Sequence, residues 1–307
     1  MARSVSLLRQ AVALPNLRRA WKEVAENKGI AGVDHISIKR WARNSEARLH
    51  RLREDVLRSR YRPRKLRRRF IPKRRSPERR ELRIPTVTDR VLQRAVLQVL
   101  YPVFEPRFYE GSFGYRPGRG LKDAVQRILV LRANDYRYVV DADIDDFFNQ
   151  VDHARLLDFL RADLPDGSLL GLIRAWLRIA QVEPDEARGI PMGSPLSPLL
   201  ANVYLHRLDQ TIADSNFPLV RYADDFLVFA ETRQGRERAY TLVAERLADL
   251  KLRYEPGKTR LTTFEEGFRF VGVWFQGETY EYTYRDKRIE VEGDRVDGLF
   301  GQYGPEY

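Results

Sequence analysis

The 307-residue chain contains no cysteine, only two methionines and only four histidines. The absence of cysteine excludes disulfides, thiolate zinc sites and cysteine-based catalysis. The histidines lie at positions 35, 50, 153 and 206, without the spacing of metal ligands. No apolar run reaches the length of about 18 residues that a membrane span needs, and no signal peptide is present. We therefore expect no membrane segment and a cytoplasmic location.

Positive charge is concentrated in one segment. The chain carries a net charge of +12, with a pI near 9.9. Residues 48–83 contain 17 Lys/Arg and 4 Asp/Glu, so this segment accounts for the whole excess. Such a block is typical of polyanion binding through phosphate contacts. A solvated basic tail is the alternative, but interleaved apolar residues such as Leu52, Leu57 and Phe70 favour folding.

Two adjacent carboxylates, Asp224 and Asp225, interrupt the apolar run 219–229. The pattern predicts strand, tight turn and strand, with both aspartates at the turn. Neighbouring like charges cost stability unless a cation neutralises them, and Mg²⁺ facing nucleotide phosphates would do so. The plainer interpretation is a solvated turn, because Asp is a favoured turn residue.

Asp143 ends another apolar strand, expected over 138–144, and lies 81 residues before Asp224. An isolated Asp at a strand end is usually a cap. If the two elements are neighbouring strands, however, three carboxylates converge. Two metal ions about 3.5–4 Å apart could then clamp an in-line phosphoryl displacement.

Hydrophobic periodicity predicts an α+β fold in which helices cover one face of a small antiparallel sheet. Residues 1–60 are expected to be mainly helical, with a glycine-containing break at 28–34. Extended runs are expected at 62–72 and 83–87, and Thr88 or Asp89 is expected to cap the next helix. Further helices are expected near 121–132, 152–162, 167–180, 199–212 and 236–251, with strands from 260 to 292.

Six more blocks follow one another along the chain. They are 71–73 with 82–93, 112–120, 143–153, 189–202, 256–260 and 268–272. Together with Tyr222-Ala223-Asp224-Asp225, they resemble the motifs of bacterial group II intron-like reverse transcriptases over roughly residues 15–276. The resemblance implies right-hand fingers and palm, with a split βαβ antiparallel palm sheet and a minimal or absent thumb. It places the N-terminal helical region and fingers at 1–137, the palm at 138–276 with a fingers insertion at about 150–190, and a short tail at 277–307.

The resemblance also implies RNA-directed DNA polymerase activity with two Mg²⁺ ions, or Mn²⁺ in their place. Its partners would be an RNA template, a DNA or RNA primer and dNTPs. Asp143, Asp224, Asp225 and the backbone carbonyl of Ile144 would hold the metal ions. Lys258 would protonate the leaving pyrophosphate, although a surface lysine is the alternative.

Further roles follow from the same resemblance. Lys73 and Arg80 would grip the triphosphate, although neighbouring arginines could take their place. Phe148 would exclude a ribose 2′-OH unless it is a core residue beside Phe147, and Met192 and Gly193 would form the nucleotide-site loop. The residues expected to contact nucleic acid are Arg67, Arg69, Arg116, Arg119 and Tyr222.

Two departures from the family pattern stand out. Met192 replaces a Gln and cannot donate its amide hydrogen bonds, so we expect altered dNTP affinity or fidelity. Only about 30 residues follow the 268–272 block, so the thumb would be minimal, or supplied by a fused or partner protein. The short chain is similar to CRISPR-associated reverse transcriptases that work with the Cas1/Cas2 integrase in spacer acquisition from RNA. Alternatives are an intron-derived orphan, another antiphage defence enzyme, and a catalytically weak nucleic-acid-binding subunit.

Overall fold

The computed structural model describes residues 6–72, 79–181, 186–284, 287–293 and 296. The chain forms two compact units, one comprising Met1–Arg107 with Val151–Val203 and the other Phe108–Gln150 with Tyr204–Tyr307. The predicted domain boundaries, after residues 137 and 276, do not coincide with the limits of these units. The functional domains stay a prediction. No helix in the described ranges is both long enough and apolar enough to span a bilayer.

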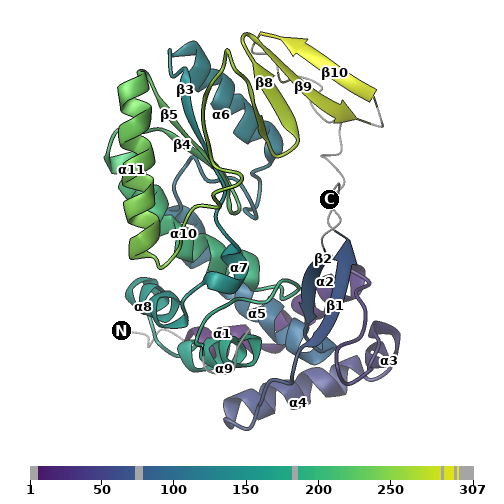
Figure 1. The fold of residues 1–307 in the computed structure, drawn as a ribbon. Helices are drawn as coiled ribbons and strands as arrows, with labels where there is room; N and C mark the ends of the chain where they lie inside the picture. Colours follow the sequence, from purple (N-terminus) through teal and green to yellow (C-terminus); the bar gives the residue numbers. More distant parts are fainter. Residues whose placement is uncertain (1–5, 73–78, 182–185, 285–286, 294–295, 297–307) are drawn as a thin grey trace. The chain divides into compact units, whose positions relative to one another are not determined.

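The first unit combines helices with a two-stranded hairpin (Figure 1). Its N-terminal helices are α1 (Leu7–Ala11), α2 (Leu14–Glu26), α3 (Ile38–Ala42) and α4 (Ser45–Leu57), as the sequence predicts. The antiparallel strands β1 (Arg67–Pro72) and β2 (Arg79–Ile84) form the hairpin. The remaining elements are α5 (Val87–Phe104), η1 (Glu105–Arg107), α8 (His153–Asp163), α9 (Leu170–Ala180) and the start of α10 (Ser197–Asp214).

The start of α5 differs from the prediction. Thr86, and neither Thr88 nor Asp89, is the N-cap: its hydroxyl accepts from the Asp89 backbone N–H at 3.1 Å. The same hydroxyl donates to the Asp89 carboxylate at 2.7 Å, so the two side chains satisfy each other at the helix start. Val87 is consequently helical, and the extended run ends at Ile84.

The second unit is built on an antiparallel sheet of strand order β4-β5-β3-β6, which confirms the predicted α+β fold. The strands are β3 (Tyr138–Ala142), β4 (Leu219–Tyr222), β5 (Asp225–Ala230) and β6 (Arg260–Thr263). A second antiparallel sheet, of order β10-β9-β8-β7, contains β7 (Phe268–Phe270), β8 (Val273–Gln276), β9 (Thr279–Tyr284) and β10 (Lys287–Glu292). The helices are α6 (Leu121–Ala133), α7 (Phe147–Gln150), α11 (Arg233–Asp249) and the end of α10.

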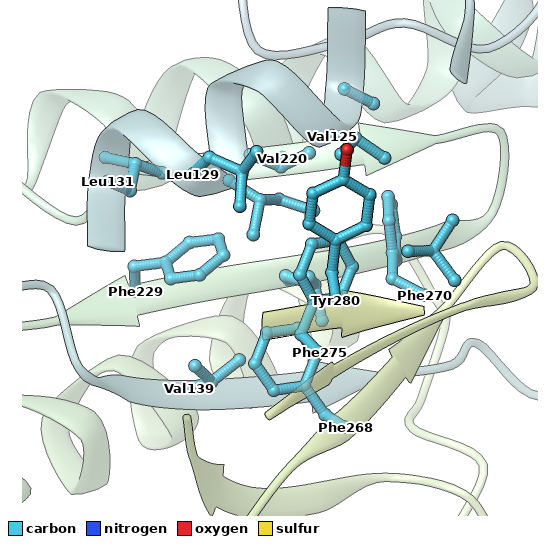
Figure 2. Close-up of a cluster of buried hydrophobic side chains, with 14 of the residues drawn as sticks. Val125, Leu129, Leu131, Val139, Val220, Phe229, Phe268, Phe270, Phe275 and Tyr280 are labelled. Atoms are coloured by element: carbon cyan, nitrogen blue, oxygen red, sulfur yellow. The ribbon is translucent and has the colours of Figure 1, made fainter. Parts of the chain in front are cut away.

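In the β4-β5-β3-β6 sheet, alternate residues along each strand lie on opposite faces. Figure 1 shows α11 (Arg233–Asp249) on one side of this sheet, and α6 with the second sheet on the other. Val139, Leu227 and Phe229 join the α6 side, where they meet aromatic side chains from the second sheet (Figure 2). Arg132 of α6 is buried and donates to the carbonyls of Gly277 (3.0 Å) and Gly293 (3.2 Å). The described residues beyond 276 are therefore held against α6 by both packing and hydrogen bonds.

The aromatic cluster yields a stability prediction. Phe275 is fully buried between Phe268 (5.3 Å between ring centroids) and Tyr280 (6.1 Å). Phe275→Ala should destabilise the protein by about 3–5 kcal/mol, because a large cavity opens in a packed core. The same change at Phe70, which is 59% exposed, should alter stability by only about 0.5 kcal/mol. Urea denaturation followed by circular dichroism measures both, and equal midpoints would contradict this account of the core.

Candidate active site

Strand register brings two of the predicted carboxylates together. On the β3–β5 ladder Ala142 pairs with Phe226, at the last pair before the strands separate. Continued by one residue, this antiparallel register sets Asp143 opposite Asp225. Directly opposed residues lie on the same face, with Cβ atoms about 4.5–5.5 Å apart. Asp141 shares that face because it lies two residues before Asp143.

The connection between β4 and β5 carries the third carboxylate. Tyr222 pairs with Asp225, so the connecting residues are Ala223 and Asp224. The prediction that both aspartates lie in the turn is therefore wrong for Asp225, which is the first residue of β5. Ala223 has a φ of 63°, a left-handed conformation that turns the chain tightly enough for the ladder to reach Asp225.

Residues 253–255 support the other side of the Asp143 strand end. The Asp145 N–H donates to the Arg253 carbonyl at 3.1 Å, and the Glu255 N–H donates to the Asp143 carbonyl at 2.9 Å. Ile144 lies between these two hydrogen-bonded residues and bridges to Tyr254, so its own carbonyl points away from 253–255. The carbonyl therefore points toward the β5 side of the strand, where the sequence predicts a backbone ligand to a metal ion.

An ion pair that the sequence reasoning missed reinforces this contact. The Arg253 guanidinium lies 2.6 Å and 2.8 Å from one carboxylate oxygen of Asp145, through Nη2 and Nε. The partners are 108 residues apart in the chain, so no local pattern could have revealed the pair. Its place beside Asp143 and Ile144 makes it a support for the site.

The site holds more negative charge than it compensates. Burial, and then the like charges around it, raise the pKa of Asp225 to about 8, against the opposing charge of Lys258. The neighbours responsible are Asp141, Asp143 and Asp224. Burial likewise raises the pKa of Asp141 to about 6. The Lys258 ammonium lies 3.3 Å from the Asp143 carboxylate, and the charge of Arg260 opposes the rise in the pKa of Asp141.

A cavity of about 470 Å³ opens over these residues. Asp141, Asp143, Asp225 and Lys258 line it together with residues of β6 and of the β7–β8 hairpin. That hairpin turns through Val271 and Gly272, which both have positive φ, the backbone of a tight hairpin turn. The 268–272 block therefore lines the same cavity as the carboxylates.

The donor set fits Mg²⁺ or Mn²⁺, because carboxylate and carbonyl oxygens are hard ligands. Within the described ranges, however, no three His, Asp or Glu residues are arranged to hold a metal ion by themselves. Mg²⁺ sites commonly use one or two carboxylates together with waters and substrate phosphates. The residues thus fit ions whose coordination a bound nucleotide completes.

Other predicted residues of the second unit have distinct surroundings. Phe148 of α7 is half-buried, with its ring edge-on to buried Phe147 at 5.4 Å between centroids. Arg119 is half-buried and lies 5.7 Å from the Phe113 ring centroid. Arg116 is buried and donates at 2.7 Å to the carbonyls of Tyr109 and Ser112. Arg116 thus holds its own loop, and its contact with nucleic acid stays a prediction.

In the first unit, the nucleotide-loop residues lie against β2. The Met192 carbonyl accepts from the Arg83 N–H at 2.8 Å. Gly193 has a φ of 118°, and a Cβ there would lie 3.1 Å from the Arg83 carbonyl oxygen, so only glycine fits without strain. Arg69 and Arg80 of the hairpin are exposed, whereas Arg67 is half-buried. Lys73 lies outside the described residues.

Comparison with known sequences gives a consistent result. The sequence profile described as "Reverse transcriptase (RNA-dependent DNA polymerase)" matches residues 71–275. The chain is 30% identical to the group II intron-encoded protein LtrA of Lactococcus lactis subsp. cremoris over 229 residues, which cover 71% of this chain and 38% of LtrA. It is 28% identical to protein YkfC of Escherichia coli (strain K12), covering 78% of this chain and 74% of YkfC.

Solved structures show the shared fold. An apo telomerase from Candida tropicalis matches 69% of this chain and 53% of its own, with 12% identity and a TM-score of 0.51. A chain of a partial Cas6-RT-Cas1–Cas2 complex matches 81% of this chain and 44% of its own, with 26% identity and a TM-score of 0.48. A likeness at that score supports no conclusion about partners.

The raised pKa of Asp225 predicts a pH-dependent stability. An acid whose folded pKa is about 8 binds its proton more tightly in the folded state. Its favourable contribution is complete below the unfolded pKa near 4 and is lost as pH rises to about 8. In EDTA, the stability of wild type relative to Asp225→Asn should therefore fall between pH 5 and pH 8. Mg²⁺ should reduce the difference at pH 8, and thermal melts at both pH values measure it. A pH-independent difference would contradict the electrostatic account.

Proposed function

The chain belongs to the reverse transcriptase (RNA-dependent DNA polymerase) family, and we propose that it copies RNA into DNA by two-metal nucleotidyl transfer. One observation carries the proposal. The β3–β5 register aligns Asp143 with Asp225 beside Asp224, and Asp143 and Asp225 line a cavity that also contains Lys258. A scaffold that only bound nucleic acid would have no physical reason to collect closely spaced carboxylates there.

The residues have separate roles in the proposed reaction. When bound, two Mg²⁺ ions lower the pKa of the primer 3′-OH and neutralise charge on the leaving pyrophosphate. Asp143, Asp224, Asp225 and the Ile144 carbonyl would hold these ions. The Lys258 ammonium, which faces the same cavity, would give a proton to the pyrophosphate as it leaves.

Substrate selection is assigned to residues outside the carboxylate set. The Phe148 ring would exclude a ribose 2′-OH and so favour dNTPs. Exposed arginines of the β1–β2 hairpin, Arg69 and Arg80 among them, would bind phosphates of the template or of the nucleotide. Met192 and Gly193 would shape the nucleotide-site loop, and the effect of Met192 on fidelity stays a prediction.

The biological setting is a finer proposal. The Arg-rich segment 48–83 and the block 139–153 resemble those of CRISPR-associated reverse transcriptases. We therefore propose that the chain works with a partner such as the Cas1/Cas2 integrase during spacer acquisition or another antiphage process. The chain spans 38% of the length of LtrA, so that protein's whole activity does not transfer to this chain.

Primer extension on an RNA template with dNTPs and Mg²⁺ tests the polymerase function. Asp224→Asn and Asp225→Asn should each lower the extension rate by about 1,000-fold or more, the order reached when a group that stabilises only the transition state is removed. Asp249→Asn, which removes an exposed carboxylate of α11, is the matched control and should extend at the wild-type rate. Extension that survives both site substitutions would overturn the mechanism. A wild-type chain that binds RNA yet never extends, even with its partner, would favour the binding-subunit alternative.

The proposed steric role of Phe148 makes a separate prediction. Phe148→Val should raise the use of rNTPs relative to dNTPs by about 10–100-fold, because removing the ring makes room for a 2′-OH. Phe148→Tyr keeps the ring and should keep the preference for dNTPs. Single-nucleotide incorporation with matched rNTP and dNTP measures the ratio of kcat/KM values. An unchanged ratio in Phe148→Val would show that the ring is only a packing partner of Phe147.

A further inference from the structure

A buried ion pair lies directly behind the catalytic turn. Arg221 of β4 donates through Nε to one carboxylate oxygen of Asp209 at 2.7 Å and through Nη2 to the other at 2.6 Å. Asp209 belongs to α10, and both side chains are 0% exposed. The bidentate geometry is the strongest that a guanidinium forms with a carboxylate.

The remaining terminal nitrogen of this guanidinium reaches the turn itself. Arg221 Nη1 donates to the Ala223 carbonyl at 2.8 Å. This carbonyl is part of Ala223, the residue with a φ of 63°, and of the peptide bond that leads into Asp224. Rotation of that peptide would redirect both Asp224 and the start of β5. The hydrogen bond from Arg221 opposes this rotation.

A backbone contact holds the turn from another direction. The Arg221 N–H donates to the Gly111 carbonyl at 2.8 Å, and the Phe113 N–H donates to the Arg221 carbonyl at 2.8 Å. A Cβ on Gly114 would lie 2.3 Å from the Ala223 nitrogen, so the two backbones touch with no room for a side chain. The 111–114 segment therefore lies along β4 and against the turn.

Neither a gain in protein stability nor compensation of the acidic cluster explains why this ion pair is buried here. A buried ion pair is often no more stabilising than apolar residues of similar volume, because both charges lose their hydration. The pair is also neutral overall, so it does not offset the negative charge of the acidic cluster. What apolar residues could not reproduce is the hydrogen bond to the Ala223 carbonyl.

We infer that Asp209 and Arg221 are positioning residues, which hold the peptide before Asp224 so that Asp224 and Asp225 keep the geometry for binding divalent cations. The inference rests on the proposed polymerase function. Asp209 fixes the guanidinium plane, and Arg221 transmits that orientation to the turn. Misplacing reacting groups by about 1 Å can cost about 100-fold in rate, so small movements of this turn matter.

The double variant Arg221→Met with Asp209→Leu tests the inference, because it replaces the pair by apolar side chains of similar size. It should fold, yet kcat for primer extension should fall by about 10–100-fold while the dNTP KM changes little. The Mg²⁺ concentration for half-maximal rate should rise several-fold. The matched control, Arg94→Met with Glu23→Leu, removes an ion pair of the first unit and should change none of these values. Wild-type kcat and Mg²⁺ dependence in the Asp209/Arg221 variant would overturn the inference.

Two further measurements keep the result decisive. If the double variant does not fold, Arg221→Lys keeps the charge beside Asp209 but loses the fork, and it should show the same rise in Mg²⁺ requirement. Mn²⁺ binding to the chain with a dNTP but without primer or template, followed by electron paramagnetic resonance, separates this inference from the polymerase function. Several-fold weaker Mn²⁺ binding in the variant supports positioning even if the wild type extends no primer. Equal Mn²⁺ affinity would overturn it.

Discussion

The pairing of β3 with β5 is the constraint on which the site depends. Side chains alternate across a strand, so a slip of one residue would send Asp143 to the opposite face of the sheet. The observed register, continued by one residue, instead sets Asp143 against Asp225 and keeps Asp141 on their side. Register is well specified here because Val139, Leu227 and Phe229 of the same two strands are buried in the core under α6. Hydrophobic packing thus decides where the charges lie.

Two backbone segments and the second sheet surround the acidic cluster. Segment 253–255 binds the strand end through backbone hydrogen bonds, and the 111–114 segment lies against the turn at Ala223. The second sheet closes over the same cavity through the β7–β8 hairpin. These contacts are largely between backbone groups, so they add no cation to Lys258 and Arg260, which only partly offset the carboxylates. A site of this kind gains most from cations that arrive with a substrate.

Much of this arrangement follows from local patterns. Strand periodicity around Asp143, the Asp-Asp step at 224–225 and the helical periodicity of 121–132 and 236–251 predicted elements that the structure contains. The errors were local too. The α5 cap lies at Thr86 because its hydroxyl reaches the Asp89 N–H, and Asp225 belongs to β5 because Tyr222 pairs with it. Both errors concern element ends, where one hydrogen bond decides the boundary.

The sequence by itself determined the α+β architecture, the acidic residues and the family motifs, because periodicity and residue type act within a few positions. Only the tertiary structure decided which groups meet. Arg253 reaches Asp145 across 108 residues, Arg116 turns inward to its own loop, and Arg221 binds Asp209 because a strand packs on a helix. The sequence around a charged side chain does not show which group that side chain will contact. Whether it faces solvent, a loop carbonyl or a carboxylate is settled by burial, which depends on the packing of distant elements.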